Sequence, residues 1–162
     1  MTKPMTISFS YDKRQVLQAL RYHFISRPEI KVMIILVNIF ALACVVLYYL
    51  KKIAAFAVLT GSCMWFFLMI SFWFAMPGLV YRRAATFKDS FTMEFEEEGF
   101  SLSNKRGSKK WQWKALSTFM ESPNFFHLYF DSRSFFLIPK SGFSDRDAIY
   151  EMRQLLKAKV KK

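Results

Sequence analysis

The stretch Val32–Leu50 reads VMIILVNIFALACVVLYYL and carries no formal charge over 19 residues. As a helix it would rise about 28 Å, close to the roughly 30 Å hydrocarbon core of a bilayer. After Lys51 and Lys52, a second uncharged run of 29 residues extends from Ile53 to Tyr81. Neither run has the polar face that a helix on a soluble core keeps. We therefore expect a transmembrane helical hairpin over residues 32–81, with helices at about 32–50 and 54–76.

Basic residues near the ends of these runs predict the orientation of the hairpin. Lys51 and Lys52 lie in the tight loop, and the other membrane-proximal basic residues lie at the opposite end: Arg14, Arg21, Arg27, Lys31, Arg82 and Arg83. The positive-inside rule therefore places both termini in the cytoplasm. Pro77 and Gly78 are expected to end or kink the second helix.

Segregation of charge from apolar sequence explains an unusual composition. The 162-residue chain is 53% hydrophobic and yet has a net charge of +12. Residues 1–31 contribute +4 and residues 82–162 contribute +6, so most of the excess lies on the expected cytoplasmic side. Attraction to an anionic membrane surface accounts for this balance better than nucleic-acid binding does. Two cysteines exclude a disulfide framework and a cysteine-based zinc module.

Residues 1–31 are expected to form a cytoplasmic strand and an amphipathic helix. Thr6–Ser10 alternates apolar and polar residues, which is a weak strand signal. From Asp12 to Pro28 the apolar residues recur at helical spacing, with basic residues elsewhere on the surface. This helix would either lie on anionic headgroups or pack on the cytoplasmic domain, and the sequence leaves both alternatives open.

Residues 82–162 are expected to form a small α+β cytoplasmic domain. Apolar residues alternate in segments that predict an antiparallel meander of about five strands, with 109–121 as one long strand or a bulged pair. Ser144 is the expected N-cap of an amphipathic helix that follows and closes the meander. The fold class is therefore a membrane α-helical hairpin plus this domain.

Several short motifs in this order resemble one known family. They are Phe95–Phe100 (FEEEGF), Trp113–Leu116 (WKAL), Phe126–Phe130 (FHLYF), Ile138–Phe143 (IPKSGF) and a helix with Leu155-Leu156. The chain resembles the YcxB-like family of small bacterial membrane proteins. This resemblance implies a two-helix anchor in the bacterial inner membrane and a PH-like cytoplasmic domain. It implies no established enzymatic activity, and for some members a role as immunity or accessory proteins beside toxin or secretion loci.

The sequence contains no recognisable catalytic or metal-binding set. His23 and His127 are isolated, without a second ligand at metal spacing. Glu96, Glu97 and Glu98 adjoin a glycine turn, where carboxylates are solvated rather than held in the two different environments that acid–base chemistry needs. No phosphate or dinucleotide fingerprint is present. We expect a non-enzymatic protein without a cofactor or a small-molecule substrate.

One constellation combines basic and aromatic residues: Lys105, Arg106, Lys109, Lys110, Trp111 and Trp113. On a hairpin tip near a membrane it would attract anionic lipid or an acidic partner, with the tryptophans entering the headgroup zone. The same cluster would suit nucleic acid, although the charge distribution makes that partner unexpected. The alternate spacing of the two tryptophans is also typical of side chains that face a core.

Two functional hypotheses follow. In the first, the hairpin anchors a cytoplasmic domain that binds a protein partner, a second copy or anionic headgroups. In the second, the hairpin pairs inside the bilayer with a membrane-targeted toxin and protects the cell. Small or polar residues suited to helix contacts are Asn38, Gly61, Ser62 and Ser71.

Overall fold

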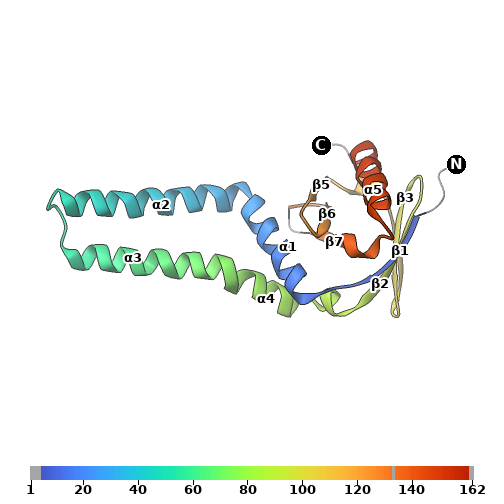
Figure 1. The fold of residues 1–162 in the computed structure, drawn as a ribbon, viewed down its shortest axis with the longest axis horizontal. Coiled ribbons are helices and arrows are strands. Elements are labelled where there is room, and N and C mark those ends of the chain that lie inside the picture. The colour runs from blue at the N-terminus through green and yellow to red at the C-terminus, as the bar shows by residue number, and fades with distance from the viewer. Residues whose placement is uncertain (1–4, 133, 161–162) are drawn as a thin grey trace. The chain divides into compact units, whose positions relative to one another are not determined.

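The structure is a computed structural model that describes residues 5–132 and 134–160 (Figure 1). It has two compact units, which we name the β unit (Met1–Ala19 with Ala84–Lys162) and the hairpin unit (Leu20–Arg83). Two long apolar helices, small antiparallel sheets and a C-terminal helix agree with the expected α+β class. The ends of the expected flanking domains, residues 1–4 and 161–162, lie outside the described residues. The expected N-terminal division at residue 31 differs from the observed one, because the first strand joins a sheet of the β unit.

The hairpin unit contains two helices that run side by side (Figure 1). The first, α2, spans Pro28–Tyr49, and the second runs from Ala55 to Arg83. Both are long and apolar enough to cross a membrane, and none of either apolar window is buried inside the protein. A core helix of a soluble protein would be covered on at least one face.

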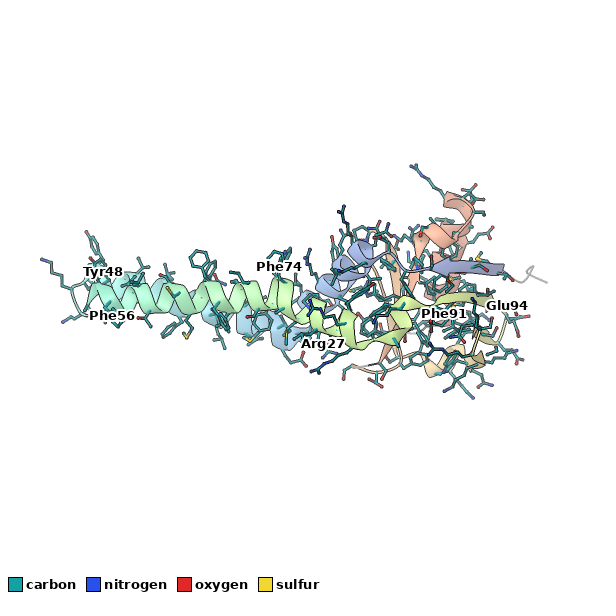
Figure 2. The ribbon with its side chains drawn as sticks, turned by 90° about the horizontal axis from the view of Figure 1, so that it is seen from below. Arg27, Tyr48, Phe56, Phe74, Phe91 and Glu94 are labelled. Atoms are coloured by element: carbon teal, nitrogen blue, oxygen red, sulfur yellow. The ribbon has the colours of Figure 1, made fainter. Side chains whose placement is uncertain are left out.

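Each hairpin helix presents a narrow contact face and a broad exposed face. Partly buried residues recur at helical spacing, at positions 34, 37, 41 and 44 of α2 and 58, 61, 65 and 68 of the second helix. Elsewhere large apolar side chains are exposed, including Leu42 at 65% and Phe67 at 71%. Figure 2 shows Tyr48 and Phe56 near the loop and Phe74 and Arg27 near the opposite end.

The loop between the helices begins with a left-handed residue. Lys51 has a φ of 55°, which is unusual for a residue other than glycine. Its N–H donates to the carbonyl of Tyr48 at 2.9 Å, and the N–H of Lys52 donates to the carbonyl of Leu47 at 2.8 Å. These two bonds form a Schellman cap, which satisfies the last carbonyls of α2 and reverses the chain.

The second helix continues through Pro77 instead of ending there. It consists of α3 (Ala55–Ile70), a π-helical turn (Ser71–Ala75) and α4 (Met76–Arg83), so it extends beyond the expected end at residue 76. Proline has no N–H, so the carbonyl of Trp73, four residues earlier, lacks its usual helical donor. The wider turn directly before Pro77 is the local distortion that accompanies this loss.

A four-stranded antiparallel sheet forms one side of the β unit. Its order is β1 (Met5–Ser10), β2 (Ser90–Phe95), β3 (Gly99–Asn104) and β4 (Gly107–Gln112). The weak strand signal at Thr6–Ser10 is confirmed, because β1 pairs with β2 along its whole length. The alternating apolar residues of β1 and β2 are buried: Ile7, Phe9, Phe91, Met93 and Phe95. The hairpin unit is thus inserted in sequence between two paired strands.

A break at Trp113 corrects the expected long strand over 109–121. A 3₁₀ turn, Trp113–Ala115, separates β4 from β5 (Thr118–Glu121), and these strands belong to different sheets. Trp113 is buried, and its indole N–H donates to the carbonyl of Glu96 at 3.1 Å. Gly99 permits the close approach of β3 and β4, because a Cβ there would lie 2.0 Å from the carbonyl oxygen of Trp111. Among the described residues after 82, six strands, β2–β7, are therefore divided between two sheets, instead of forming a single meander of about five.

The second sheet has the order β5, β6 (Phe125–Tyr129) and β7 (Phe135–Pro139), again antiparallel. The C-terminal helix, α5, spans Arg146–Lys159. Its N-cap is Asp145, whose carboxylate accepts from the N–H of Ala148 at 2.8 Å, rather than the expected Ser144. One core joins both sheets and α5, and its fully buried members include Phe100, Phe126, Leu128, Ile138, Met152 and Leu156.

The first half of helix α1 (Lys13–Ser26) packs within the β unit. Val16 and Ala19 are buried. Gln18 accepts a hydrogen bond from the side-chain amide of Asn124 at 2.9 Å, which ties the helix to the turn before β6. For these residues the structure agrees with packing on the domain, one of the two alternatives that the sequence left open.

Candidate partner-binding surfaces

The basic residues around the β3–β4 turn do not form one open patch. Lys105 and Arg106 are exposed at the turn, and Arg106 lies 3.7 Å from the carboxylate of Asp89. Lys109 and Lys110 are neighbours on strand β4 and so point to opposite faces of the sheet. Lys110 forms an ion pair with Glu96, and the Nζ of Lys109 lies 5.3 Å from the ring centre of Trp111. Two of the four cations are therefore partly neutralised within the domain.

The two tryptophans of the predicted cluster belong mainly to the core. Trp113 is only 4% exposed. Trp111 is partly buried, stacks on Phe100 with ring centres 5.6 Å apart, and contacts Phe136 edge-to-face at 5.2 Å. Trp113 therefore cannot reach a lipid headgroup, and Trp111 exposes only part of its ring to solvent.

Arg21 has a structural partner inside the hairpin unit. Its Nε donates to the carbonyl oxygen of Trp73 at 3.0 Å, and its guanidinium carbon lies 5.2 Å from the Trp73 ring and 5.4 Å from the Phe74 ring. That carbonyl is the one that Pro77 leaves without a helical donor. Arg21 therefore replaces a missing N–H and adds a cation–π contact. We name this arrangement the Arg21 clamp.

The remaining basic residues that were predicted to lie near a membrane are mostly exposed. Arg14, Lys31, Arg82 and Arg83 are exposed, and Arg27 is half-buried. Burial, and secondly the positive charge of Arg27, lower the pKa of His23 to about 4. His23 is therefore neutral at physiological pH and adds no charge to this end of the hairpin unit.

Two of the predicted helix-contact residues serve the hairpin itself. Asn38 accepts a hydrogen bond from the indole N–H of Trp65 at 3.3 Å, and its amide donates to the carbonyl of Ile34 at 2.7 Å. Gly61 faces α2, since a Cβ there would lie 3.8 Å from the sulfur of Cys44. Ser71 is half-buried in the π-helical turn, whereas Ser62 is exposed. The structure thus brings Asn38 and Gly61 to one interface and leaves Ser62 outside it.

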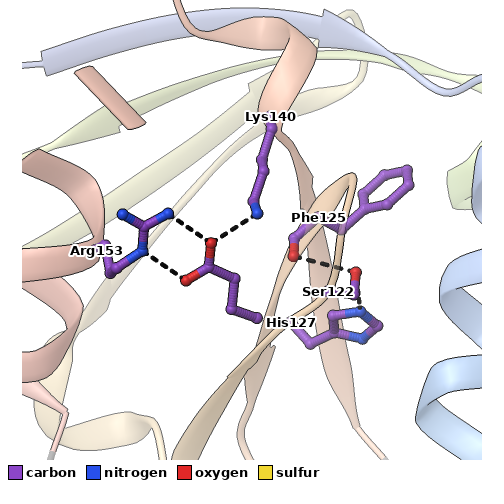
Figure 3. Close-up of polar contacts among 6 residues, drawn as sticks. Ser122, Phe125, His127, Lys140 and Arg153 are labelled. Carbon is purple, nitrogen blue, oxygen red and sulfur yellow. Dashed lines mark hydrogen bonds and ion pairs between the residues drawn. The ribbon is translucent and has the colours of Figure 1, made fainter. Parts of the chain in front are cut away.

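A polar cluster that the sequence did not predict joins three elements of the β unit (Figure 3). Glu121 on β5 accepts two hydrogen bonds of 2.7 Å from Arg153 on α5 and one of 2.6 Å from Lys140 in the turn after β7. The hydrogen bonds from Arg153, and then the contacts with Lys140, lower the pKa of Glu121 to about 2. The cluster therefore fastens α5 to the second sheet at neutral pH.

A buried serine and histidine lie beside this cluster. The Nε2 of His127 and the Oγ of Ser122 are 3.0 Å apart, and the hydroxyl of Ser122 also donates to the carbonyl of Phe125 at 3.2 Å (Figure 3). Such a pair resembles an activated nucleophile. Because Ser122 is 5% exposed and His127 fully buried, a substrate cannot approach them, and the contact is structural. Among residues 5–132 and 134–160, no group of three or more potential ligands could hold a metal ion.

A groove of about 790 Å³ lies between the end of β2 and the outer face of α5. We name it the β2–α5 groove; it is lined by Met5, Phe95, Glu96, Glu97, Tyr150, Glu151, Gln154, Leu155, Ala158 and Lys159. These residues come from three separate segments of the chain. Glu96 and Glu97 adjoin a glycine turn in the sequence and were expected to be solvated there. Their position beside α5 was not predicted.

Comparison with known proteins found a family match for one region of the chain. Residues 95–156 match the family described as YcxB-like protein, which confirms the resemblance over these residues. No curated protein and no solved structure matches the chain. The matched region runs from the last residue of β2 into α5, so it includes the Glu121 cluster and most of the β2–α5 groove.

Proposed function

We propose that this chain, YcxB-like over residues 95–156, is a membrane-anchored interaction protein without enzymatic activity. In this proposal its hairpin spans the bacterial inner membrane twice with both termini in the cytoplasm. The β unit is a PH-like domain that binds a protein partner or anionic lipid at the membrane surface. The exposed apolar surface of the hairpin carries the proposal.

The exposure of the hairpin supports membrane insertion. Leu42 and Phe67 are more than half exposed, and neither apolar window is buried by the rest of the chain. In water each such side chain would forgo about 1.5–3 kcal/mol of burial free energy. A bilayer provides that burial for the whole outer surface at once.

Charge and aromatic residues support the proposed orientation. The loop carries only Lys51 and Lys52, whereas the other end of the hairpin unit carries Arg21, Arg27, Lys31, Arg82 and Arg83. Tyr48 and Tyr49 adjoin the loop, and Tyr49 is 85% exposed, as suits a residue at a membrane–water interface.

The topology of the β unit supports a PH-like domain. Two antiparallel sheets, with the orders β1-β2-β3-β4 and β5-β6-β7, share a core with a C-terminal helix. Strand β1 lies before the hairpin in sequence and pairs with β2 after it. A fragment of residues 82–162 would therefore lack an edge strand, so binding experiments require the full chain.

Site-directed cysteine labelling tests the anchor. Cys44 and Cys63 are replaced by serine, and single cysteines are introduced at Lys52 in the loop or Ser108 in the β unit. With a maleimide that does not cross membranes, we expect intact cells to label Lys52→Cys but not Ser108→Cys. Permeabilised cells should label both. Labelling of Ser108→Cys from outside, or recovery of the protein without membranes, would contradict the proposed topology.

A second measurement separates lipid from protein binding. The full chain in phosphatidylcholine nanodiscs is titrated with short-chain phosphatidylglycerol, using a Lys105→Gln/Lys109→Gln variant as comparison. Saturable binding that weakens in the variant would favour headgroup recognition at the β3–β4 turn. Absence of binding at low salt would leave a protein partner as the ligand, in keeping with the internal pairing of Arg106 and Lys110.

The alternative function is self-protection through the hairpin. Asn38 and Gly61, two of its four candidate residues, are engaged within the hairpin. Deletion of the β unit should leave protection intact if the hairpin alone pairs with a toxin. Loss of protection in cells where the hairpin still inserts would argue against it.

A further inference from the structure

The β2–α5 groove combines an apolar lining with carboxylates. Met5 and Leu155 are partly buried and pack against the core, and Tyr150 on α5 is 56% exposed. Three carboxylates and one ammonium group, that of Lys159, also line the groove. A groove of this kind provides contacts for an apolar side chain and an adjacent positive charge.

Two of the groove carboxylates lack an ion-pair partner among residues 5–132 and 134–160. Some other carboxylates of the β unit cap helix α5 or pair with basic side chains, as Asp145, Glu121 and Asp89 do. Glu96 pairs with Lys110. Within the part of the chain that the structure describes, Glu97 and Glu151 have no ion-pair partner, and both are exposed.

The charge of the groove argues against lipid as its occupant. The chain as a whole has a net charge of +12, whereas carboxylates outnumber ammonium groups in the groove. Anionic headgroups would be repelled by Glu97 and Glu151. A cationic segment would be attracted by them.

We infer that the β2–α5 groove binds a basic segment of a partner protein, with an apolar side chain placed against Tyr150 and Leu155 and a Lys or Arg beside Glu97 and Glu151. This inference rests on the proposed function and specifies its partner. Tyr150 supplies the exposed aromatic contact that commonly anchors such interfaces.

The test uses the full chain in phosphatidylcholine nanodiscs, which carry no net charge that would attract basic peptides. A displayed library of random peptides is selected on it after subtraction on empty nanodiscs, and single peptides are then measured by fluorescence anisotropy. We expect the selected peptides to be rich in Lys and Arg and to contain an aromatic or aliphatic residue. Their binding should weaken as salt is raised.

Matched variants locate the binding. Glu97→Gln/Glu151→Gln should weaken binding about fivefold, since exposed ion pairs are individually modest. Glu94→Gln/Glu98→Gln removes the same charge from residues that do not line the groove and should leave affinity unchanged. Tyr150→Ala should weaken binding without affecting its salt dependence. All five positions are on the surface, so these variants should fold.

Four outcomes would overturn the inference. They are peptides without basic enrichment, equal weakening by both double variants, displacement of the peptide by short-chain phosphatidylglycerol, and binding that emerges only after removal of residues 1–4 and 161–162. The last result would mean that the terminal residues of this chain, and not a partner protein, occupy the groove. Failure to enter nanodiscs would instead contradict the membrane anchor, so the two failures are distinguishable.

Discussion

Leu128 in the β unit is fully buried, whereas Leu42 in the hairpin unit keeps 65% of its surface exposed. The same contrast separates Phe100, at 0% exposure, from Phe67, at 71%. The β unit buries its apolar side chains by packing them against one another. The hairpin unit leaves most of its apolar side chains for another environment. Apolar content alone therefore does not distinguish a core from a membrane anchor; the direction in which the side chains face does.

The largest effect is expected from a matched pair of truncations. Leu128→Ala should lower the free energy of unfolding by about 2–5 kcal/mol, because it opens a cavity in a closed core. Leu42→Ala should change it by less than about 0.5 kcal/mol in detergent, since no protein packs over that side chain. Denaturant unfolding followed by tryptophan fluorescence measures both. Equal losses would mean that the two units do not differ in this way.

A charge introduced on the outer face of the hairpin tests whether that face meets lipid. Leu42→Arg should disfavour membrane insertion by about 3 kcal/mol, because in the proposed topology a guanidinium would replace an apolar side chain near mid-membrane. The measurement is the fraction of protein that resists alkaline extraction from membranes. Tyr49→Arg, beside the loop, is the control and should remain in the membrane. Unchanged extraction of Leu42→Arg would mean that this face does not meet lipid.

The Glu121 cluster gives the β unit a dependence on pH. Glu121→Gln should cost about 1–2 kcal/mol at pH 7, a value reduced from the full pKa shift because the side chain is partly solvated. The folded-state pKa of about 2 lies below the ordinary value of 4.5, so this stabilisation is present above about pH 4.5 and lost as pH falls toward 2. The stability difference between wild type and variant should therefore shrink through this range. Glu98→Gln, which lacks such partners, should show no comparable difference.

The Arg21 clamp should have the smallest effect. Arg21→Ala removes the hydrogen bond to the Trp73 carbonyl and the cation–π contact, together worth about 1 kcal/mol at a partly exposed site. Hydrogen exchange at the amides of residues 71–76 should accelerate about fivefold, while Arg83→Ala should leave it unchanged. Equal protection in all three proteins would show that the π-helical turn does not need Arg21.

Local patterns in the sequence were sufficient for several predictions. The uncharged runs around Lys51 and Lys52 predicted the two apolar helices, and alternation in Thr6–Ser10 predicted a strand. The spacing of Trp111 and Trp113 left core and surface open; Trp113 lies in the core and Trp111 packs partly buried against it. Each of these signals depends on neighbours within one element.

Other features had no local signal. The pairing of β1 with β2 joins residues that are 80 to 90 positions apart, and the break at Trp113 places β4 and β5 in separate sheets. The Glu121 cluster and the β2–α5 groove each combine residues from three segments. One signal was available for the cap of α5: Asp145 stands three residues before Ala148, as a capping carboxylate does.

Composition and periodicity alone determined that this chain has a two-helix apolar hairpin, flanking strands and a closing amphipathic helix. Charge distribution alone predicted which end of the hairpin is basic. Only the tertiary structure decided which cations of the β unit are paired, because Asp89, Glu96 and Glu121 reach Arg106, Lys110 and Arg153 across the fold. Only the tertiary structure also formed the groove. The physical reason is that Coulomb interactions and packing depend on distance in space, which chain position does not specify.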